Sequence, residues 1–191
     1  RDVYLLSRSK KHIRDIFIKS DLTTVTAEMD FDGEVTCSLY DGDVFLKSKK
    51  AKGKVEFTVP DAKQWTAETP NLYTLVFSAE GEYIPQRFGF RTIGVSDKGE
   101  LLINGVSVKL KGINRHDTHP EYGHYTPYDA MVKDLTVMKQ LNINTIRTSH
   151  YPPTSEFLSL CDEFGFYVID ETDIEIHGFV SRNRFYKYET F

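Results

Sequence analysis

Cysteine and tryptophan are scarce in this chain, and no long apolar run occurs. The 191 residues include two cysteines and one tryptophan. Cys37 falls in a predicted strand and Cys161 in a predicted helix of a different region, so we do not expect a disulfide framework. Reduced thiols are typical of the cytosol, and we therefore expect a cytoplasmic protein. No segment approaches the roughly 20 apolar residues that a membrane-spanning helix needs.

Excess positive charge is also absent. The formal net charge is −4, from 24 basic and 28 acidic residues, which gives no reason to expect nucleic acid or a membrane surface as a partner. The chain opens on Arg1-Asp2 and not on the basic and apolar start of a secretory signal, so we expect no signal peptide. Because it lacks an initiator methionine and stops abruptly at Phe191, we expect a piece excised from a longer protein.

The first half of the chain alternates apolar and polar residues with a period of two, which predicts strands with one buried face. Turn signals at Asp32-Gly33, Asp41-Gly42 and Glu80-Gly81 separate these runs. This spacing predicts an all-β immunoglobulin-like sandwich over residues 1–96. The apolar positions are Val25, Ala27, Met29, Val35, Cys37, Leu39, Val55, Phe57, Val59, Leu75, Phe77 and Ala79.

Two features of this half admit a binding role or a structural one. The lysine-rich run 47–54 could be an electrostatic patch, but we expect a solvated loop that discourages edge pairing. Trp65 could stack on a sugar, but beside Pro70 and Tyr73 we expect it to pack inside the protein.

From residue 97 the sequence pattern changes and predicts alternating strands and helices. Asn104-Gly105 predicts a hairpin turn, and strands are predicted at 108–113, 143–148 and 166–170. Thr126 and Pro127 predict a helix start with Thr126 as N-cap, and a second helix is expected over 154–164. This order is the beginning of a parallel (β/α)8 TIM barrel.

Only three of the barrel strands fit into residues 97–191. A closed barrel needs eight strands and roughly 250 residues. We therefore expect an incomplete barrel that is marginally stable beyond about residue 100 unless another part of the protein covers it.

Polar residues follow each of the predicted barrel strands. His116 follows the first, Arg147 and His150 end the second, and Asp170, Glu171, Glu175 and His177 follow the third. Since the carboxyl ends of parallel strands meet at one rim, we expect an active-site pocket there. His119 and His124 could suggest zinc, but their spacing matches no closed zinc site.

The same segments carry a family resemblance that covers nearly the whole chain. The run from Asn144 through His150-Tyr151-Pro152 to Asp162 and Gly165 resembles the signature of glycoside hydrolase family 2, which includes β-galactosidases, β-glucuronidases and β-mannosidases. The segments Gly112–Pro120 and Asp173–Gly178 are similar to those of the β-galactosidases. The segments around Trp65–Tyr73 and Gly89–Arg91 resemble the sandwich domain of the family.

The resemblance implies a retaining β-galactosidase that hydrolyses terminal β-D-galactosides such as lactose in carbohydrate metabolism. It implies that His116 and His150 hydrogen-bond the sugar, with a backbone-bonded structural role as the alternative. Arg147 would meet the catalytic nucleophile or its neighbours, or else form a structural ion pair. Asp170 and Glu171 point to opposite faces of a strand and are expected to be structural.

The resemblance also implies a magnesium ion held by Glu175 and His177. Their spacing of two lets both side chains face one ion in extended backbone, although by spacing alone a salt-bridged pair fits as well. Both catalytic glutamates would lie beyond residue 191, so we expect this chain alone to be inactive and the longer protein to form a homo-oligomer. Asp173, where many relatives carry Asn, could tune the metal or face solvent.

Two other functions stay open. One is a different activity of the same family, β-glucuronidase or β-mannosidase. The other is a non-catalytic carbohydrate-binding or scaffold module, which an exposed row of aromatic residues would favour. The aromatic residues of the first half are instead dispersed and mostly at inward-looking positions.

Overall fold

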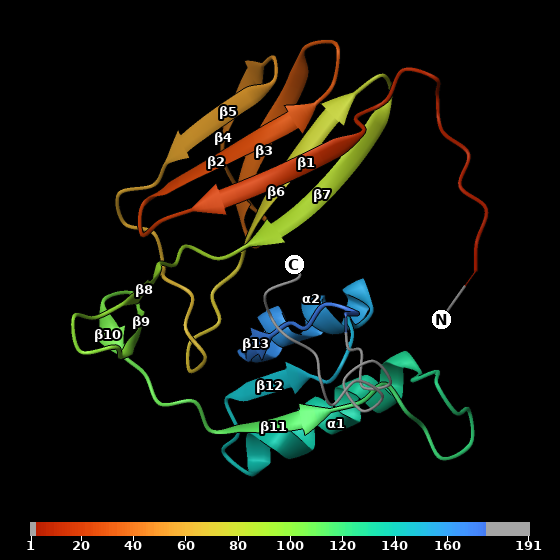
Figure 1. Cartoon of the computed structure of the whole chain (residues 1–191). Coiled ribbons are helices and arrows are strands. Elements are labelled where there is room, and N and C mark those ends of the chain that lie inside the picture. The colour runs from red at the N-terminus through yellow and green to blue at the C-terminus, as the bar shows by residue number, and fades with distance from the viewer. Residues whose placement is uncertain (1–2, 175–191) are drawn as a thin grey trace, which may run out of the picture.

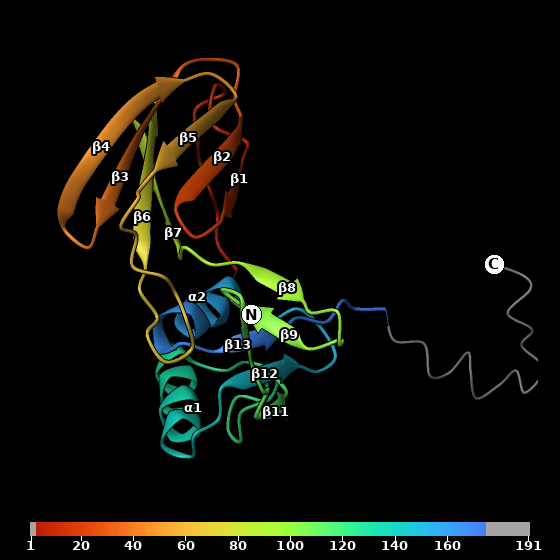
Figure 2. The same cartoon turned by 90° about the vertical axis from the view of Figure 1, so that its left-hand side faces the viewer.

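The computed structural model describes residues 3–174, and its first half is a sandwich of two antiparallel sheets (Figure 1). The three-stranded sheet has the order β1 (Asp15–Ser20), β2 (Thr24–Asp30), β5 (Lys54–Thr58). The four-stranded sheet has the order β4 (Val44–Ala51), β3 (Val35–Asp41), β6 (Tyr73–Ala79), β7 (Glu82–Phe88). Figure 2 shows the two sheets as separate layers. The two layers agree with the predicted sandwich, and the immunoglobulin-like assignment stays a prediction.

The alternating apolar residues form the core between the two sheets. The central positions of β2, β3, β5 and β6 are buried, as the alternation predicts, because every second side chain of a strand points to the same face. The Cys37 thiol lies within this core, and burial raises its pKa to about 11. Phe17 and Phe45, by contrast, are exposed. They lie on β1 and β4, which belong to different sheets, so they form no continuous aromatic row.

The lysine-rich run is not a loop, and the prediction for it was wrong. Residues 47–51 complete β4, which is the edge strand of its sheet. The Lys49 Nζ donates to the Glu56 carbonyl oxygen at 2.6 Å, and Lys47 reaches the Thr58 carbonyl oxygen. Both acceptors lie on β5, the edge of the other sheet. The lysines therefore bridge two sheet edges and occupy carbonyl groups that could otherwise pair with another strand.

A small hairpin sheet connects the two halves. It contains β8 (Ile93–Val95), β9 (Leu101–Ile103) and β10 (Val106–Ser107). Asn104 has φ 52° and Gly105 has φ 77°. Positive φ at both central residues is what a tight two-residue hairpin turn requires, so the predicted Asn-Gly turn is confirmed.

The second half is a βαβαβ unit with a parallel sheet in the order β11-β12-β13. Its elements are β11 (Gly112–Arg115), α1 (Tyr128–Gln140), β12 (Thr145–Thr148), α2 (Ser155–Phe164) and β13 (Tyr167–Ile169). This is the predicted opening of a parallel α/β barrel. The two helices pack on the sheet through a core that includes Met131, Leu135 and Met138, the predicted apolar stripe of α1.

The first barrel strand begins four residues later than predicted. The Asn144 side chain accepts from the Lys111 N–H at 2.8 Å and donates to the Lys109 carbonyl oxygen at 3.0 Å. These hydrogen bonds take the place of a strand partner along the segment before Gly112. The Asn144 side chain therefore binds the backbone of residues 109–111, a segment that its apolar residues alone predict to be a strand.

The helix starts agree with the sequence at α2 and differ at α1. Thr154 caps α2 by accepting from the Phe157 N–H, and Gly165 ends it with φ 75°. The N-cap of α1, however, is Pro127 and not Thr126. Because Pro127 is itself extended, with ψ 156°, the helix begins one residue later than predicted, and no side-chain cap bond forms there. Neither helix of the described segment has the length and apolar character that crossing a membrane requires.

The sandwich and the α/β unit meet at Trp65. Its side chain is 1% exposed, and the indole N–H donates to the Asp162 carbonyl oxygen at 2.9 Å. Its ring lies edge-on to Tyr167, with 5.8 Å between centroids, and the Arg91 guanidinium lies 4.8 Å from the ring centroid. The expected packing role of Trp65 is confirmed.

Two charged side chains, Lys139 and Arg87, add further contacts between the sandwich and the α/β unit. Lys139 of α1 donates to the Ala67 carbonyl oxygen at 2.9 Å and to the Gly165 carbonyl oxygen at 3.0 Å. Arg87 of β7 forms an ion pair with Glu163 of α2. The loop around residues 64–70 therefore joins the sandwich directly to both barrel helices.

Candidate functional site

The three parallel strands end at one rim, and polar side chains follow each of them. Register pairs place Arg115 opposite Thr148 and Arg147 opposite Ile169. The rings of His116 and His150 come within 5.4 Å of each other, measured between centroids, at an interplanar angle of 71°. The structure thus brings together the two histidines that are far apart in the sequence. Glu175 and His177 lie outside the described residues.

Arg147, His150 and Glu171 form one connected cluster at this rim. Arg147 Nε and Nη2 both lie 2.6 Å from Glu171 Oε1. His150 Nδ1 lies 3.2 Å from Glu171 Oε2 and 3.3 Å from Arg147 Nη2. Hydrogen bonds from Arg147 lower the pKa of Glu171, with a smaller contribution from His150. Glu171 is therefore the ionised partner that holds both cationic and imidazole side chains in place.

Among the described residues, the carboxylate partner of Arg147 is Glu171, which follows β13. This is the ion pair that the sequence left open as one of two possibilities for Arg147. Glu171 also belongs to the site cluster, although we expected it to be only structural. Its position two residues beyond β13, and two residues beyond the level of Arg147, was the available signal.

Asp170 and Glu171 diverge, as adjacent residues of an extended segment should. The Thr148 hydroxyl donates to Asp170 Oδ1 at 3.1 Å and accepts from the Glu171 N–H at 3.1 Å. The Asp170 carboxylate is thus bound on the Thr148 side, whereas that of Glu171 meets Arg147 and His150. These two carboxylates do not flank a common position.

The loops that carry the two histidines are tied to each other. The Asp117 N–H donates to the Tyr151 phenol oxygen at 3.0 Å, and the Tyr151 ring lies 6.0 Å from that of His116. The Ser149 N–H donates to the Arg115 carbonyl oxygen at 3.0 Å. The relative position of His116 and His150 is therefore supported by hydrogen bonds between the residues adjacent to them in the sequence.

A shallow depression of about 390 Å³ lies at this rim, lined by Arg147, His150, Glu171, Thr172 and Ile174. Asp173 is exposed next to it. An imidazole can both donate and accept hydrogen bonds, so this rim can bind a hydroxylated molecule.

The other two histidines of the His116 loop lie apart from this cluster. The His119 ring stacks on Tyr122 with 4.8 Å between centroids, and its Nδ1 accepts from the Glu121 N–H. Within residues 3–174, no three His, Cys, Asp or Glu side chains gather in a way that could hold a metal ion.

Comparison with known proteins matches both halves of the chain to one family. Residues 11–91 match the family model described as "Glycosyl hydrolases family 2", and residues 93–190 match "Glycosyl hydrolases family 2, TIM barrel domain". The chain belongs to glycoside hydrolase family 2.

Several curated relatives are β-galactosidases. The protein of Actinobacillus pleuropneumoniae is 40% identical over 187 residues, covering 93% of this chain and 18% of that protein. The protein of Streptococcus thermophilus is 36% identical over 200 residues, covering 93% of this chain and 19% of that protein. The chain spans about a fifth of the length of the curated relatives it matches.

Several similar solved structures are β-glucuronidases. That of Faecalibacterium prausnitzii has a TM-score of 0.79 at 31% identity, covering 85% of this chain and 28% of that chain. That of Bifidobacterium dentium has a TM-score of 0.77 at 28% identity, covering 84% and 30%.

Proposed function

We propose that this chain is the sandwich and the start of the catalytic barrel of a retaining β-galactosidase. The longer protein would hydrolyse terminal non-reducing β-D-galactosides, such as lactose, in carbohydrate metabolism. Curated β-galactosidases at 34–40% identity over most of the chain support this substrate. The loop Gly112–Pro120 and the segment from Asp173 onward also resemble that activity most closely.

The observation that carries the proposal is the balance of charge at the rim. Of the described residues that line the depression, Arg147 alone has a fixed positive charge, and Glu171 neutralises it at 2.6 Å. A glucuronide carries a carboxylate that needs a cation of its own. A galactoside is neutral and needs only hydroxyl partners, which the imidazoles of His116 and His150 supply.

We assign the chemical roles on this basis. His116 and His150 bind sugar hydroxyls, and Arg147 positions His150 and Glu171. A retaining glycosidase needs two carboxyl groups about 5–5.5 Å apart on either side of the scissile bond. Asp170 and Glu171 diverge and do not form such a pair. As the family resemblance implies, the nucleophile and the acid/base would be two glutamates beyond residue 191.

Glu175 and His177 are proposed to hold Mg²⁺ in the longer protein, where the ion would supply positive charge beside the sugar. Replacing Glu175 by Gln there should weaken activation by Mg²⁺, because a carboxylate ligand is lost. The measurement is the dependence of galactoside hydrolysis on Mg²⁺ concentration in both proteins. Identical dependence in the wild type and in Glu175→Gln would contradict this assignment.

The 191-residue chain by itself should not hydrolyse a chromogenic β-galactoside, even with Mg²⁺ present, because it lacks both catalytic glutamates. The measurement is product release over a buffer blank, with the longer protein at equal molar concentration as the positive control. Turnover by the short chain at a rate near that of the longer protein would show that the catalytic carboxylates are within these residues.

A β-glucuronidase is the second candidate, because the similar solved structures carry that activity at TM-scores up to 0.79. The similarity of the backbone to these structures supports membership of the family and does not distinguish between its activities. The paired state of Arg147 and the sequence relatives favour galactose. A non-catalytic module has less support, because the aromatic residues of the sandwich core are buried between its sheets.

A further inference from the structure

The side chain of Arg115, the last residue of β11, is buried between two carboxylates. It is only 7% exposed. Its Nη1 donates to Asp117 Oδ1, and its Nε and Nη2 each lie 3.3 Å from Asp134 Oδ2 on α1. Burying a charge is costly unless the charge is paired and hydrogen-bonded, and here both conditions are met. The guanidinium therefore ties the loop after β11 to α1.

The same guanidinium also contacts α2. Its central carbon lies over the buried ring of Phe157, 4.1 Å from the ring centroid. Because a guanidinium is planar, it can bind carboxylates in its plane while its face covers an aromatic ring. One side chain thus touches three separate parts of the chain: the loop after β11, α1 and α2.

Arg115 faces the helices and not the rim. Neighbouring side chains of a strand point to opposite faces. The preceding residue, Asn114, contacts Arg147 at the rim, with 3.4 Å between Asn114 Oδ1 and Arg147 Nη1. Arg115 is not one of the residues that line the depression there. Any effect of Arg115 on a sugar bound at the rim must therefore pass through its neighbours.

These neighbours flank the two histidines of the rim. The residues on either side of His116 and His150 in the sequence are Arg115, Asp117, Ser149 and Tyr151. The Arg115 carbonyl oxygen accepts from the Ser149 N–H at 3.0 Å. The Asp117 N–H donates to the Tyr151 phenol oxygen at 3.0 Å, and the guanidinium of Arg115 holds Asp117 in turn. Arg115 thus acts on the histidine pair both through its backbone and through its side chain.

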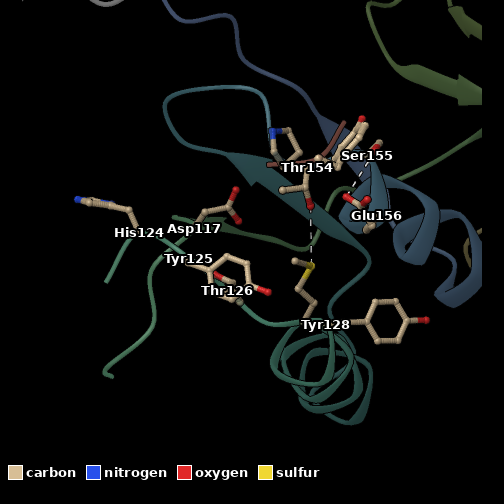
Figure 3. A pocket seen from close by; sticks show the side chains of 11 residues that line it. Asp117, His124, Tyr125, Thr126, Tyr128, Thr154, Ser155 and Glu156 are labelled. Carbon is tan, nitrogen blue, oxygen red and sulfur yellow. Dashed lines mark hydrogen bonds between the residues drawn. The ribbon is translucent and has the colours of Figure 1, made fainter. Parts of the chain in front are cut away.

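The anchor acts at the start of the loop after β11, next to His116. Figure 3 shows the Asp117 carboxylate pointing away from His124, which lies further along the same loop and extends in the opposite direction. The tip of the loop is held separately, because the backbones of His119 and Gly123 exchange two hydrogen bonds at 2.7 and 3.0 Å. Arg115 therefore fixes the part of the loop nearest the rim and not the loop as a whole.

We propose that Arg115 is a positioning residue that fixes the imidazoles of His116 and His150 relative to each other. Their ring centroids are 5.4 Å apart. The inference rests on the proposed function, in which both imidazoles bind hydroxyl groups of one sugar. Misplacing a binding group by about 1 Å can lower a rate about a hundredfold. Arg115 thus supports the rate of hydrolysis without touching the substrate.

Arg115→Lys in the longer protein keeps the charge but replaces the planar fork by one ammonium group. An ammonium cannot bind Asp117 and Asp134 and cover Phe157 at the same time. We expect kcat for a chromogenic β-galactoside to fall at least about tenfold, with a smaller change in KM, because the loss is greatest in the transition state. Asp117→Asn keeps the N–H that binds Tyr151 and weakens the ion pair. It should lower kcat as well, and it replaces Arg115→Lys in the test if that variant does not fold.

A double-mutant cycle with His150→Ala separates positioning from a general loss of structure. If Arg115 acts through His150, Arg115→Lys should lower kcat by less than about threefold once His150 is absent. The matched control is Arg14→Lys, the same change at a half-exposed arginine paired with Asp30 in the sandwich, which should leave kcat and KM unchanged. The same tenfold loss with and without His150, or no loss in folded Arg115→Lys, would overturn the proposal.

The wild type of the longer protein distinguishes a failure of this proposal from a failure of the proposed function. Hydrolysis of a β-glucuronide and not of the β-galactoside by the wild type would contradict the proposed substrate. The cycle is then measured with the glucuronide, where coupling between Arg115 and His150 would support the positioning role and its absence would overturn it.

Discussion

Replacing Trp65 by alanine should lower the free energy of unfolding by about 4 kcal/mol, the usual cost of truncating a buried tryptophan. The side chain is 1% exposed and touches both halves of the chain. Its loss would open a cavity against Tyr167, leave the Asp162 carbonyl oxygen without its donor, and remove the ring beneath Arg91. Urea denaturation followed by far-UV circular dichroism measures the change.

The matched control is Tyr83→Ala, which truncates an aromatic residue that is 74% exposed on β7. Exposed truncations of this kind usually change stability by less than about 0.5 kcal/mol. A loss for Trp65→Ala no larger than that for Tyr83→Ala would mean that Trp65 does not join the sandwich to the α/β unit in solution.

Replacing Gly165 by alanine should cost about 3 kcal/mol, because two penalties coincide at this residue. Gly165 has φ 75°, and a residue with a side chain pays roughly 1–2 kcal/mol in this left-handed conformation. A Cβ there would also overlap the Ala67 carbonyl oxygen of the sandwich loop, and overpacking adds roughly 1–3 kcal/mol. The fluorescence of Trp65, the only tryptophan, can follow unfolding.

Gly53 provides the control for the first penalty alone. It has the same φ of 75°, and an added Cβ meets nothing within 4 Å. Gly53→Ala should therefore cost only about 1–2 kcal/mol. The difference between the two variants reports the overlap with Ala67, and equal losses would show that the loop and α2 are not in close contact.

Local pattern was sufficient to predict most of the elements. The alternation of Val25, Ala27 and Met29 predicts a half-buried strand because only one face of the sheet meets the core. The helix predicted over 154–164 is found as α2, and its observed caps, Thr154 and Gly165, each satisfy backbone groups within their own turn. These rules depend on neighbours in the sequence, and the structure agrees with them there.

The predictions failed where a distant partner decides the local structure. Lys47 and Lys49 lie in an edge strand, and their ammonium groups are bound by β5. The strand near Gly112 starts late because the Asn144 side chain, more than 30 residues away, occupies the preceding backbone. The charge and hydropathy of neighbouring residues in the sequence do not predict such long-range contacts.

The candidate site was predictable in part for the same reason. Parallel strands bring their carboxyl ends together, so the approach of His116 and His150 follows from topology. The pairing of Arg147 with Glu171 depends on the side-chain directions of Arg147 near the end of β12 and of Glu171 beyond β13. The roles of these residues toward a sugar, and the metal assignment of Glu175 and His177, remain proposals.

The most direct test of the account is a comparison of kcat/KM for a β-galactoside and a β-glucuronide with the same chromogenic leaving group, using the longer protein that contains this chain. Because Glu171 already neutralises Arg147 at the rim, we predict that the galactoside is preferred by at least about a hundredfold, which corresponds to about 2.7 kcal/mol. A preference for the glucuronide, or equal values for both, would contradict the proposed substrate while leaving the family unchanged.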